Sequence, residues 1–372
     1  MIYLGVNTGT SADAVDVVIC EHHQDKQSFI GGYEFPLDAS LRAEIMDAVH
    51  DPSVSHKCLQ ALSAKLGKVY QEAIRLACEQ ANLPLQKVRA IGLHGQTIHH
   101  CPDATPPYTI QLDQAADVAN ALGVNVIAQF RASDIAAGGQ GAPLIPAYHH
   151  YLAQANQQRS AAFINLGGIA NITWFCDQQR SVRGWDIGPA NALLDAWVHK
   201  HLGKAYDDAG EWARSGRVDL DLLDRLCHDE YFGKPTPKST GRDYFNLDWL
   251  AKYVRHESPQ DIQATLVQLT VTQTANALQQ CPWKCQEPTV FLYGKGVANA
   301  FLYQKLVTAC QGMHIQKTDK LGMPPQWLEG GLFAWLAFCY EQGIAQQLQS
   351  ITGANQPCVL GACYPATKLE KA

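Results

Sequence analysis

No stretch of the sequence is apolar for long enough to cross a bilayer. The longest apolar run, residues 331–340 (GLFAWLAFCY), is far shorter than the roughly 20 residues of a spanning helix. The N-terminus also lacks the basic stretch and apolar core of a signal peptide, and it opens directly as a strand, IYLGV. We therefore expect a cytoplasmic protein that has no membrane partner.

An excess of positive charge is missing as well. Lys and Arg number 29 against 35 Asp and Glu, which gives a formal net charge of −6. Such a chain has no basic field to attract the phosphates of DNA or RNA. We therefore expect no nucleic-acid partner.

The 12 cysteines lack the paired Cys-x-x-Cys spacing of structural zinc sites. A disulfide framework is typical of short secreted chains, whereas this chain has 372 residues. Two groupings, His99–Cys101 and the pair Cys281 and Cys285, do not outweigh these points. We expect reduced, mostly buried thiols and assign no metal-ligating residue.

Two enzyme signatures are absent. The sequence contains no Gly-x-Ser-x-Gly elbow, so a serine hydrolase, the competing enzyme class, has little support. The first glycine turn is neither a Walker loop nor a Gly-x-Gly-x-x-Gly fingerprint, because no helix is predicted to start there.

One pattern, strand, glycine turn, strand, occurs twice. It reads NTGTSADAVDVVI from Asn7 and NLGGIANITWF from Asn165. An echo half a chain apart predicts an α/β protein of two lobes with related cores, and the length exceeds what one core usually organises. Apolar spacing of three and four predicts helices in 41–81 and 259–278. With the crossover near 125–132, residues 1–128 form the first lobe and 129–372 the second, whose last helix could pack back on the first.

The first turn, Gly9 to Asp16, has the residues of a phosphate loop. Backbone N–H groups of a tight glycine turn can bind phosphate oxygens, and Thr10 and Ser11 add hydroxyl donors. Asp13 or Asp16 could orient a hydrated magnesium ion. The alternative is a plain hairpin turn.

The second turn, Gly167 and Gly168 in NLGGIAN, permits the same close approach by an anion. Two such hairpins could grip a triphosphate from both sides. Asp186 in GWDIGPAN is predicted to lie in a turn after an apolar strand, where it could accept a proton from a nucleophile. The alternative is an aspartate that caps the helix starting near Asn191.

Two further segments, 94–100 (HGQTIHH) and 130–146, are predicted to be loops. They are rich in side chains that could bind a polyol, although ordinary surface loops have the same composition. The candidates are Gln96, Thr97, Arg131, Asp134 and Gln140.

These segments together resemble the anhydro-N-acetylmuramic acid kinases, a family of the actin, sugar kinase and heat-shock ATPase superfamily. The resemblance runs through nearly the whole chain, and its most specific motifs are PKSTGR and GGQGAPL. It implies a two-lobed, actin-like (ribonuclease H-like) sugar kinase fold with a central nucleotide cleft. It also implies ATP and Mg²⁺ as cofactors and a sugar from the cell wall as substrate, and it leaves open whether the protein is a homodimer.

The resemblance assigns roles to individual residues. Asp186 would be the catalytic base of a reaction that opens a 1,6-anhydro ring with water and phosphorylates O6. Thr97, Arg131 and Glu329 would line the sugar pocket. Nucleotide-binding residues would come from three loops: Gly9, Thr10, Ser11, Ala12, Asp13, Ala14, Val15 and Asp16; Gly167 and Gly168; and Gly294, Gly296 and Asn299.

Some positions depart from the family pattern. Ala14 replaces a glycine of the first loop, Lys295 a glycine of the adenosine loop, and Ile187 the threonine after the catalytic aspartate. Gly330 replaces the alanine after Glu329. Two alternatives follow: a sugar kinase of the same superfamily that opens no ring, or a nucleotide- or sugar-binding relative without turnover.

Overall fold

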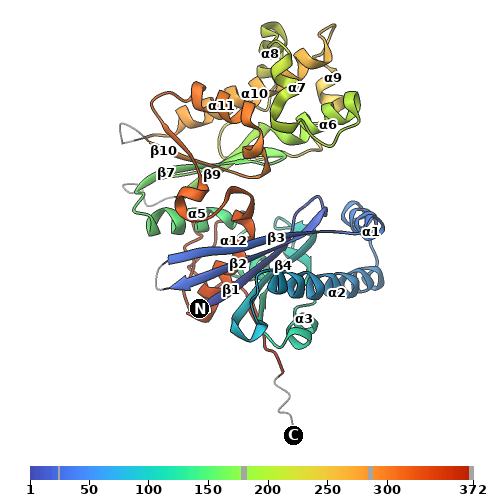
Figure 1. Cartoon of the computed structure of the whole chain (residues 1–372), viewed down its shortest axis with the longest axis vertical. Helices are drawn as coiled ribbons and strands as arrows, with labels where there is room; N and C mark the ends of the chain where they lie inside the picture. The colour runs from blue at the N-terminus through green and yellow to red at the C-terminus, as the bar shows by residue number, and fades with distance from the viewer. Residues whose placement is uncertain (24–25, 177–181, 284–287, 368–372) are drawn as a thin grey trace. The chain divides into compact units, whose positions relative to one another are not determined.

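The computed structural model describes residues 1–23, 26–176, 182–283 and 288–367. The chain forms two compact units, Met1–Ala155 together with Trp327–Ala372, and Asn156–Gln326. The first unit therefore combines the blue N-terminal strands of Figure 1 with the red C-terminal helix α12.

The boundary predicted at residues 128 and 129 falls inside the first unit, because the two helices that follow it belong there. Helix α4 (Phe130–Ala136) packs on strand β5, and α5 (Ile145–Ala155) packs on α12. Asp134 of α4 also accepts a hydrogen bond from the Thr352 hydroxyl at 2.9 Å. The chain passes to the second unit only after α5.

The first unit is built on a seven-stranded mixed sheet. Its order is β12-β6-β4-β1-β2-β3, and β5 pairs with β4. Strand β2 is antiparallel to both β1 and β3, whereas β4 runs parallel to both β1 and β6. The strands are β1 Ile2–Thr8, β2 Ala14–His23, β3 Lys26–Pro36, β4 Val88–Cys101, β5 Tyr108–Leu112, β6 Val126–Ala128 and β12 Ala362–Tyr364.

Three helices, α1 (Ala39–His50), α2 (His56–Gln80) and α3 (Ala115–Leu122), pack with this sheet. The apolar spacing that predicted helices in 41–81 is confirmed, since Leu59, Leu62 and Leu66 of α2 lie in the core. Glycines of the sheet allow close backbone contact with α12 (Leu328–Glu341). A Cβ on Gly5 of β1 or on Gly92 of β4 would overlap a carbonyl oxygen of α12. This contact fixes the start of α12, where Glu329 lies.

The second unit is built on a five-stranded sheet of order β11-β10-β7-β8-β9. Strands β7, β8 and β9 form an antiparallel meander, and β10 runs parallel to both β7 and β11. The strands are β7 Ser160–Leu166, β8 Ile169–Cys176, β9 Val182–Pro189, β10 Thr289–Tyr293 and β11 His314–Lys317. The helices are α6 Asn191–Leu202, α7 Glu211–Ser215, α8 Leu220–Cys227, α9 Leu247–Ala251, α10 Pro259–Gln280 and α11 Ala300–Ala309.

The sequence echo corresponds to a repeated topology. In each unit the hairpin that carries the glycine turn is followed by a third antiparallel strand, and its first strand pairs with a parallel strand on the other side. The predicted helix at 259–278 is confirmed as α10, whose N-cap Ser258 accepts a hydrogen bond from the Asp261 N–H.

Three local predictions are wrong. Residues 94–100 are not a loop but part of β4, where Gln96–Cys101 pairs with β5. Their polar side chains lie on a ladder whose backbone hydrogen bonds are satisfied, so polarity alone was misleading. Residues 130–136 form a helix, and Asp186 lies within β9 rather than in a turn.

Candidate active site

The first glycine turn is shorter than predicted. It comprises residues 9–13, since β2 begins at Ala14, and the Ala12 N–H donates to the Gly9 carbonyl at 3.0 Å. A Cβ built on Gly9 would have no atom within 4 Å, so this position is open to an approaching group. Val15 and Asp16 belong to β2, where Asp16 lies opposite Asn7 of β1.

The departure at Ala14 carries no backbone strain, because Ala14 is extended and pairs with Pro36 of β3. The left-handed residue of this turn is Ala12, with φ of 48° and a buried side chain. Asp13 is exposed and forms an ion pair with Arg42 at 2.9 Å. The Asp13 carboxylate, which is one of the two that could orient magnesium, is thus already paired with Arg42.

Thr97 lies in β4 with its side chain toward β5. Its hydroxyl oxygen accepts a hydrogen bond at 3.3 Å from the amide of Gln111, which also donates to Thr109 at 2.6 Å. The carbonyl oxygens of the buried Gln96 and Gln111 side chains have no partner among the described residues. Buried polar atoms normally find one, so the face that carries Thr97 and Gln111 suits a polar ligand, whereas Gln96 lies on the opposite face.

Arg131 is held by two hydrogen bonds. Its Nε donates to Nε2 of His94 at 2.9 Å, and its Nη1 donates to the Gly141 carbonyl at 3.0 Å. Burial and the nearby charge of Arg131 keep the pKa of His94 well below its usual value, so the imidazole is neutral and can accept. The His94 ring in turn stacks on Phe333 of α12, with ring centroids 4.6 Å apart.

Glu329 lies in the first turn of α12. Loss of hydration raises the pKa of its carboxyl, and the positive charge of Arg131 opposes that rise. The first unit therefore brings two predicted sugar-binding residues, Arg131 and Glu329, within electrostatic reach of each other. Asp134, in contrast, is fully buried and accepts hydrogen bonds from the Gly141 N–H and from Thr352, so it does not serve a ligand. Gln140 is exposed on the same segment.

The second glycine turn is locked onto the start of α6. The Gly168 carbonyl accepts from the N–H groups of Ala190 and Ala192 at 3.0 and 3.1 Å, and the Gly167 carbonyl accepts from Asn191 at 3.0 Å. A Cβ on Gly168 would lie 2.9 Å from the Arg242 guanidinium. This arginine was not among the predicted site residues, although the PKSTGR motif contains it.

A second unpredicted residue, Asp195 of α6, lies near the same guanidinium. Burial raises the pKa of Asp195 to about 6, with Arg242 lowering it and Asp207 raising it further. The surroundings of Gly168 thus combine a cation with a carboxyl that titrates close to neutrality.

Asp186 is held at three points on the outer edge of β9. Its N–H donates to the Lys238 carbonyl at 2.9 Å, and its carbonyl accepts from the Tyr231 hydroxyl at 2.7 Å. Its carboxylate Oδ2 accepts from the Thr240 N–H at 3.0 Å. Burial raises the pKa of Asp186, and the hydrogen bond from Thr240 limits the rise. The other carboxylate oxygen has no partner among the described residues.

The third predicted nucleotide loop follows β10. Gly294 has a φ of 87°, and a Cβ there would overlap Asn165, so glycine is required for both reasons. Asn299 caps α11, since its Oδ1 accepts from the Leu302 N–H at 3.0 Å. Lys295, which replaces a family glycine, is exposed. The amide oxygen of Asn299 is thus committed to the helix, whatever its amide nitrogen binds.

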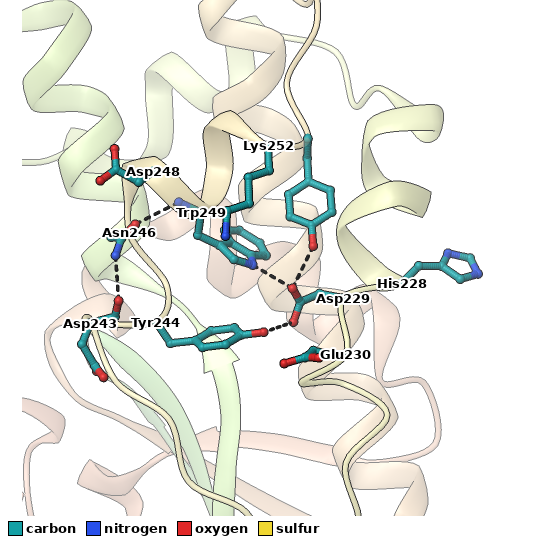
Figure 2. Close-up of a pocket in the computed structure, with 10 residues that line it drawn as sticks. His228, Asp229, Glu230, Asp243, Tyr244, Asn246, Asp248, Trp249 and Lys252 are labelled. Atoms are coloured by element: carbon teal, nitrogen blue, oxygen red, sulfur yellow. Dashed lines mark hydrogen bonds between the residues drawn. The ribbon is translucent and has the colours of Figure 1, made fainter.

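An open pocket of about 590 Å³ lies elsewhere in the second unit (Figure 2). None of the predicted site residues lines it. At its base the buried Asp229 accepts hydrogen bonds from Tyr244, Trp249 and Tyr253 at 2.8–2.9 Å.

Among the described residues, no three His, Cys, Asp or Glu side chains could hold a metal ion together, and Cys285 lies outside those residues. None of the described helices is long and apolar enough to span a bilayer.

The two units repeat one α/β topology, each with a glycine turn, and the second also holds the supported carboxylate of Asp186. The chain belongs to the anhydro-N-acetylmuramic acid kinase family, whose sequence model matches residues 1–366. A curated anhydro-N-acetylmuramic acid kinase from Coxiella burnetii (strain Dugway 5J108-111) is 38% identical over 365 residues, which are 97% of each chain. The resemblance found in the motifs and the kinase activity are thereby confirmed.

Solved structures give more distant similarities. The activator of the 2-hydroxyisocaproyl-CoA dehydratase from Clostridium difficile, with bound ADPNP, is 10% identical with a TM-score of 0.45, covering 92% of this chain and 97% of that one. The ROK hexokinase from Thermus thermophilus is 13% identical with a TM-score of 0.35, covering 91% and 99%.

Proposed function

We propose that this kinase opens the ring of 1,6-anhydro-N-acetylmuramic acid with water and transfers the γ-phosphoryl group of ATP to O6. The products are N-acetylmuramic acid 6-phosphate and ADP. Family membership supports the substrate, which is a cell-wall fragment, and the use of ATP supports a cytoplasmic location. The observation that carries the mechanism is the three-point support of Asp186.

Asp186 would act as the general base. One carboxylate oxygen is fixed by the Thr240 N–H, which leaves the other to accept a proton from water. The raised pKa makes the carboxylate a stronger base than an exposed aspartate. The water oxygen bonds to the anomeric carbon as the bond from that carbon to O6 breaks. The released O6 then attacks the γ-phosphorus, and ADP leaves.

Arg131 would bind the lactyl carboxylate of the sugar. Its Nε and one N–H of Nη1 are already engaged by His94 and Gly141, which leaves the second N–H of Nη1 and both N–H groups of Nη2 for a ligand. One N–H from each Nη nitrogen would contact the carboxylate. Glu329, whose first-turn position is fixed by the contact of α12 with the sheet, would accept hydrogen bonds from sugar hydroxyls.

The phosphates would be bound by backbone N–H groups of residues 9–13, beside the open position at Gly9. Asp13 and Asp16 have the oxygen ligands that Mg²⁺ prefers, and they would hold the ion through its water shell. The bound metal would neutralise charge on the phosphates.

Solvent labelled with heavy oxygen tests the proposal. During turnover of the anhydro sugar with ATP, the label should appear on the anomeric carbon and not in the transferred phosphate, provided that samples are taken before the free sugar exchanges. A phosphorylated sugar without label would indicate an ordinary sugar kinase. Label found only in inorganic phosphate would mean ATP hydrolysis and would refute the mechanism.

A further inference from the structure

Strand β9 is an edge strand, since it ends the order β11-β10-β7-β8-β9. An edge leaves backbone N–H and C=O groups without a strand partner. At Asp186 both groups are satisfied by another segment, the N–H by the Lys238 carbonyl and the C=O by the Tyr231 hydroxyl. The backbone on either side of the proposed base is therefore held by residues 231–240 instead of by a strand.

The segment 231–240 is closed on itself by Lys238. Its ammonium donates to the carbonyls of Tyr231 and Phe232 at 3.0 and 3.1 Å, and it lies 4.6 Å from the centre of the Tyr231 ring. One side chain thus ties the two contacts to Asp186 together.

The segment is also anchored from behind by Asp229. This carboxylate, 8% exposed, accepts from the Tyr231 N–H at 2.9 Å and from three aromatic donors that Figure 2 shows around it. Burial favours a higher pKa for Asp229, but the hydrogen bonds that its carboxylate accepts outweigh burial, and the pKa lies below its usual value. The donors are Tyr244, Trp249 and Tyr253. Asp229 is thus a charged centre that fixes the backbone at Tyr231.

We propose that Tyr231 is a positioning residue for Asp186, with Asp229 as its anchor and Lys238 as its brace. The inference rests on the proposed function, because it concerns the base of that reaction. The Tyr231 hydroxyl touches neither substrate nor the reacting atoms in this assignment. Its role is to keep the edge of β9 in register with Thr240, whose N–H holds the carboxylate.

Tyr231→Phe tests this role, since it removes one hydroxyl and leaves the backbone contact with Asp229. We expect kcat to fall about tenfold or more, because small misplacements of a reacting group are costly. The KM values for ATP and for the sugar should change less than about twofold. Without the Tyr231 hydroxyl, we expect the edge of β9 to shift and the hydrogen bond from the Thr240 N–H to Asp186 to weaken. Because that bond lowers the pKa of Asp186, the acidic limb of the kcat–pH profile should move to higher pH.

Tyr253→Phe is the matched control. Its hydroxyl binds the same Asp229 carboxylate at 2.8 Å but makes no contact with Asp186 among the described residues. This variant should lose a similar amount of thermal stability and keep both kcat and the pH profile of the parent. Equal loss of kcat in both variants would reduce Tyr231 to a general structural role.

Lys238→Met provides an independent test if Tyr231→Phe does not fold. It removes the ammonium and keeps the stem, and we expect the same fall in kcat and the same shift of the acidic limb. Unchanged kcat and an unchanged limb in whichever variant folds would overturn the inference. Asp186→Asn in the same assay separates the two proposals: if Asp186→Asn is inactive and Tyr231→Phe is normal, only the positioning role fails, whereas an active Asp186→Asn rejects the base itself.

Discussion

The two glycine turns occupy equivalent places in a repeated topology, yet they are built differently. The turn at 9–13 is open, with no atom within 4 Å of a Cβ at Gly9. The turn at Gly167 and Gly168 is locked by three backbone hydrogen bonds to the start of α6 and covered by Arg242. The first turn is therefore open to an approaching group, whereas the second has a fixed backbone with the Arg242 guanidinium beside it. A shared topology fixes where a turn lies and not what it binds.

Gly9→Val should have the largest effect on this comparison. A Cβ at Gly9 meets no protein atom within 4 Å, so the melting temperature of the variant should stay within a few degrees of the parent. The added side chain would occupy the space that phosphates need, and turnover should be abolished. Thermal melting and ADP release check both expectations. Normal turnover in the folded variant would show that the open turn does not bind the nucleotide.

Asp186→Asn should come next, with a loss of about 10²–10⁴-fold in turnover and nearly unchanged binding of ATP and sugar. The amide cannot take a proton from water, although it can still accept the Thr240 N–H. Steady-state kinetics with calorimetric binding measurements check this. Asp221→Asn, at an exposed position of α8 in the same unit, is the control and should behave as the parent.

Arg131→Lys tests whether the first unit binds the sugar through Arg131. Lysine replaces the planar fork that holds His94 and Gly141 with a single ammonium, so the KM for the sugar should rise by about tenfold. The KM for ATP should change much less. An equal rise for both ligands would point to a structural role for the arginine.

The smallest effect concerns acid stability, which should differ between the units. Burial lowers the pKa of His22 in the first unit to about 3, so unfolding takes up a proton between the unfolded value near 6.5 and about 3. The stability contribution is present above pH 6.5 and falls by about 1.4 kcal/mol per pH unit below it. Asp195 in the second unit has a raised pKa of about 6, so it favours folding as pH falls through that value.

Hydrogen exchange followed by peptide at pH 7 and pH 5 checks this difference. Protection should drop more in residues 1–155 than in residues 156–326. His22→Phe should remove part of the drop, since the ring already stacks on Phe338 with centroids 4.5 Å apart. A larger drop in the second unit would contradict the assignment.

Sequence patterns located several strands and helices for identifiable reasons, whereas the roles of the site residues stay predictions. Apolar periodicity in α2 and the proline-initiated cap at Ser258 are local signals, and local signals survive folding. The hairpin at 94–101 was missed because its polar side chains mimic a loop, while its pairing partner is fixed only in three dimensions. Arg242 and Tyr231 could not be ranked from the sequence, since their importance depends on contacts with Gly168 and Asp186 far along the chain.

The backbone contact between α12 and the first sheet has a consequence for how this protein can change over evolution. A Cβ on Gly330 would overlap the Val18 side chain, although the family usually has alanine at that position. Alanine at position 330 therefore fits only after Val18 has been replaced by a smaller residue. The two positions should show sign epistasis in a mutational scan, with Gly330→Ala harmful alone and tolerated beside Val18→Ala. Because Glu329 precedes Gly330, the permitted order of those steps is also a constraint on how the sugar pocket can be remodelled by selection.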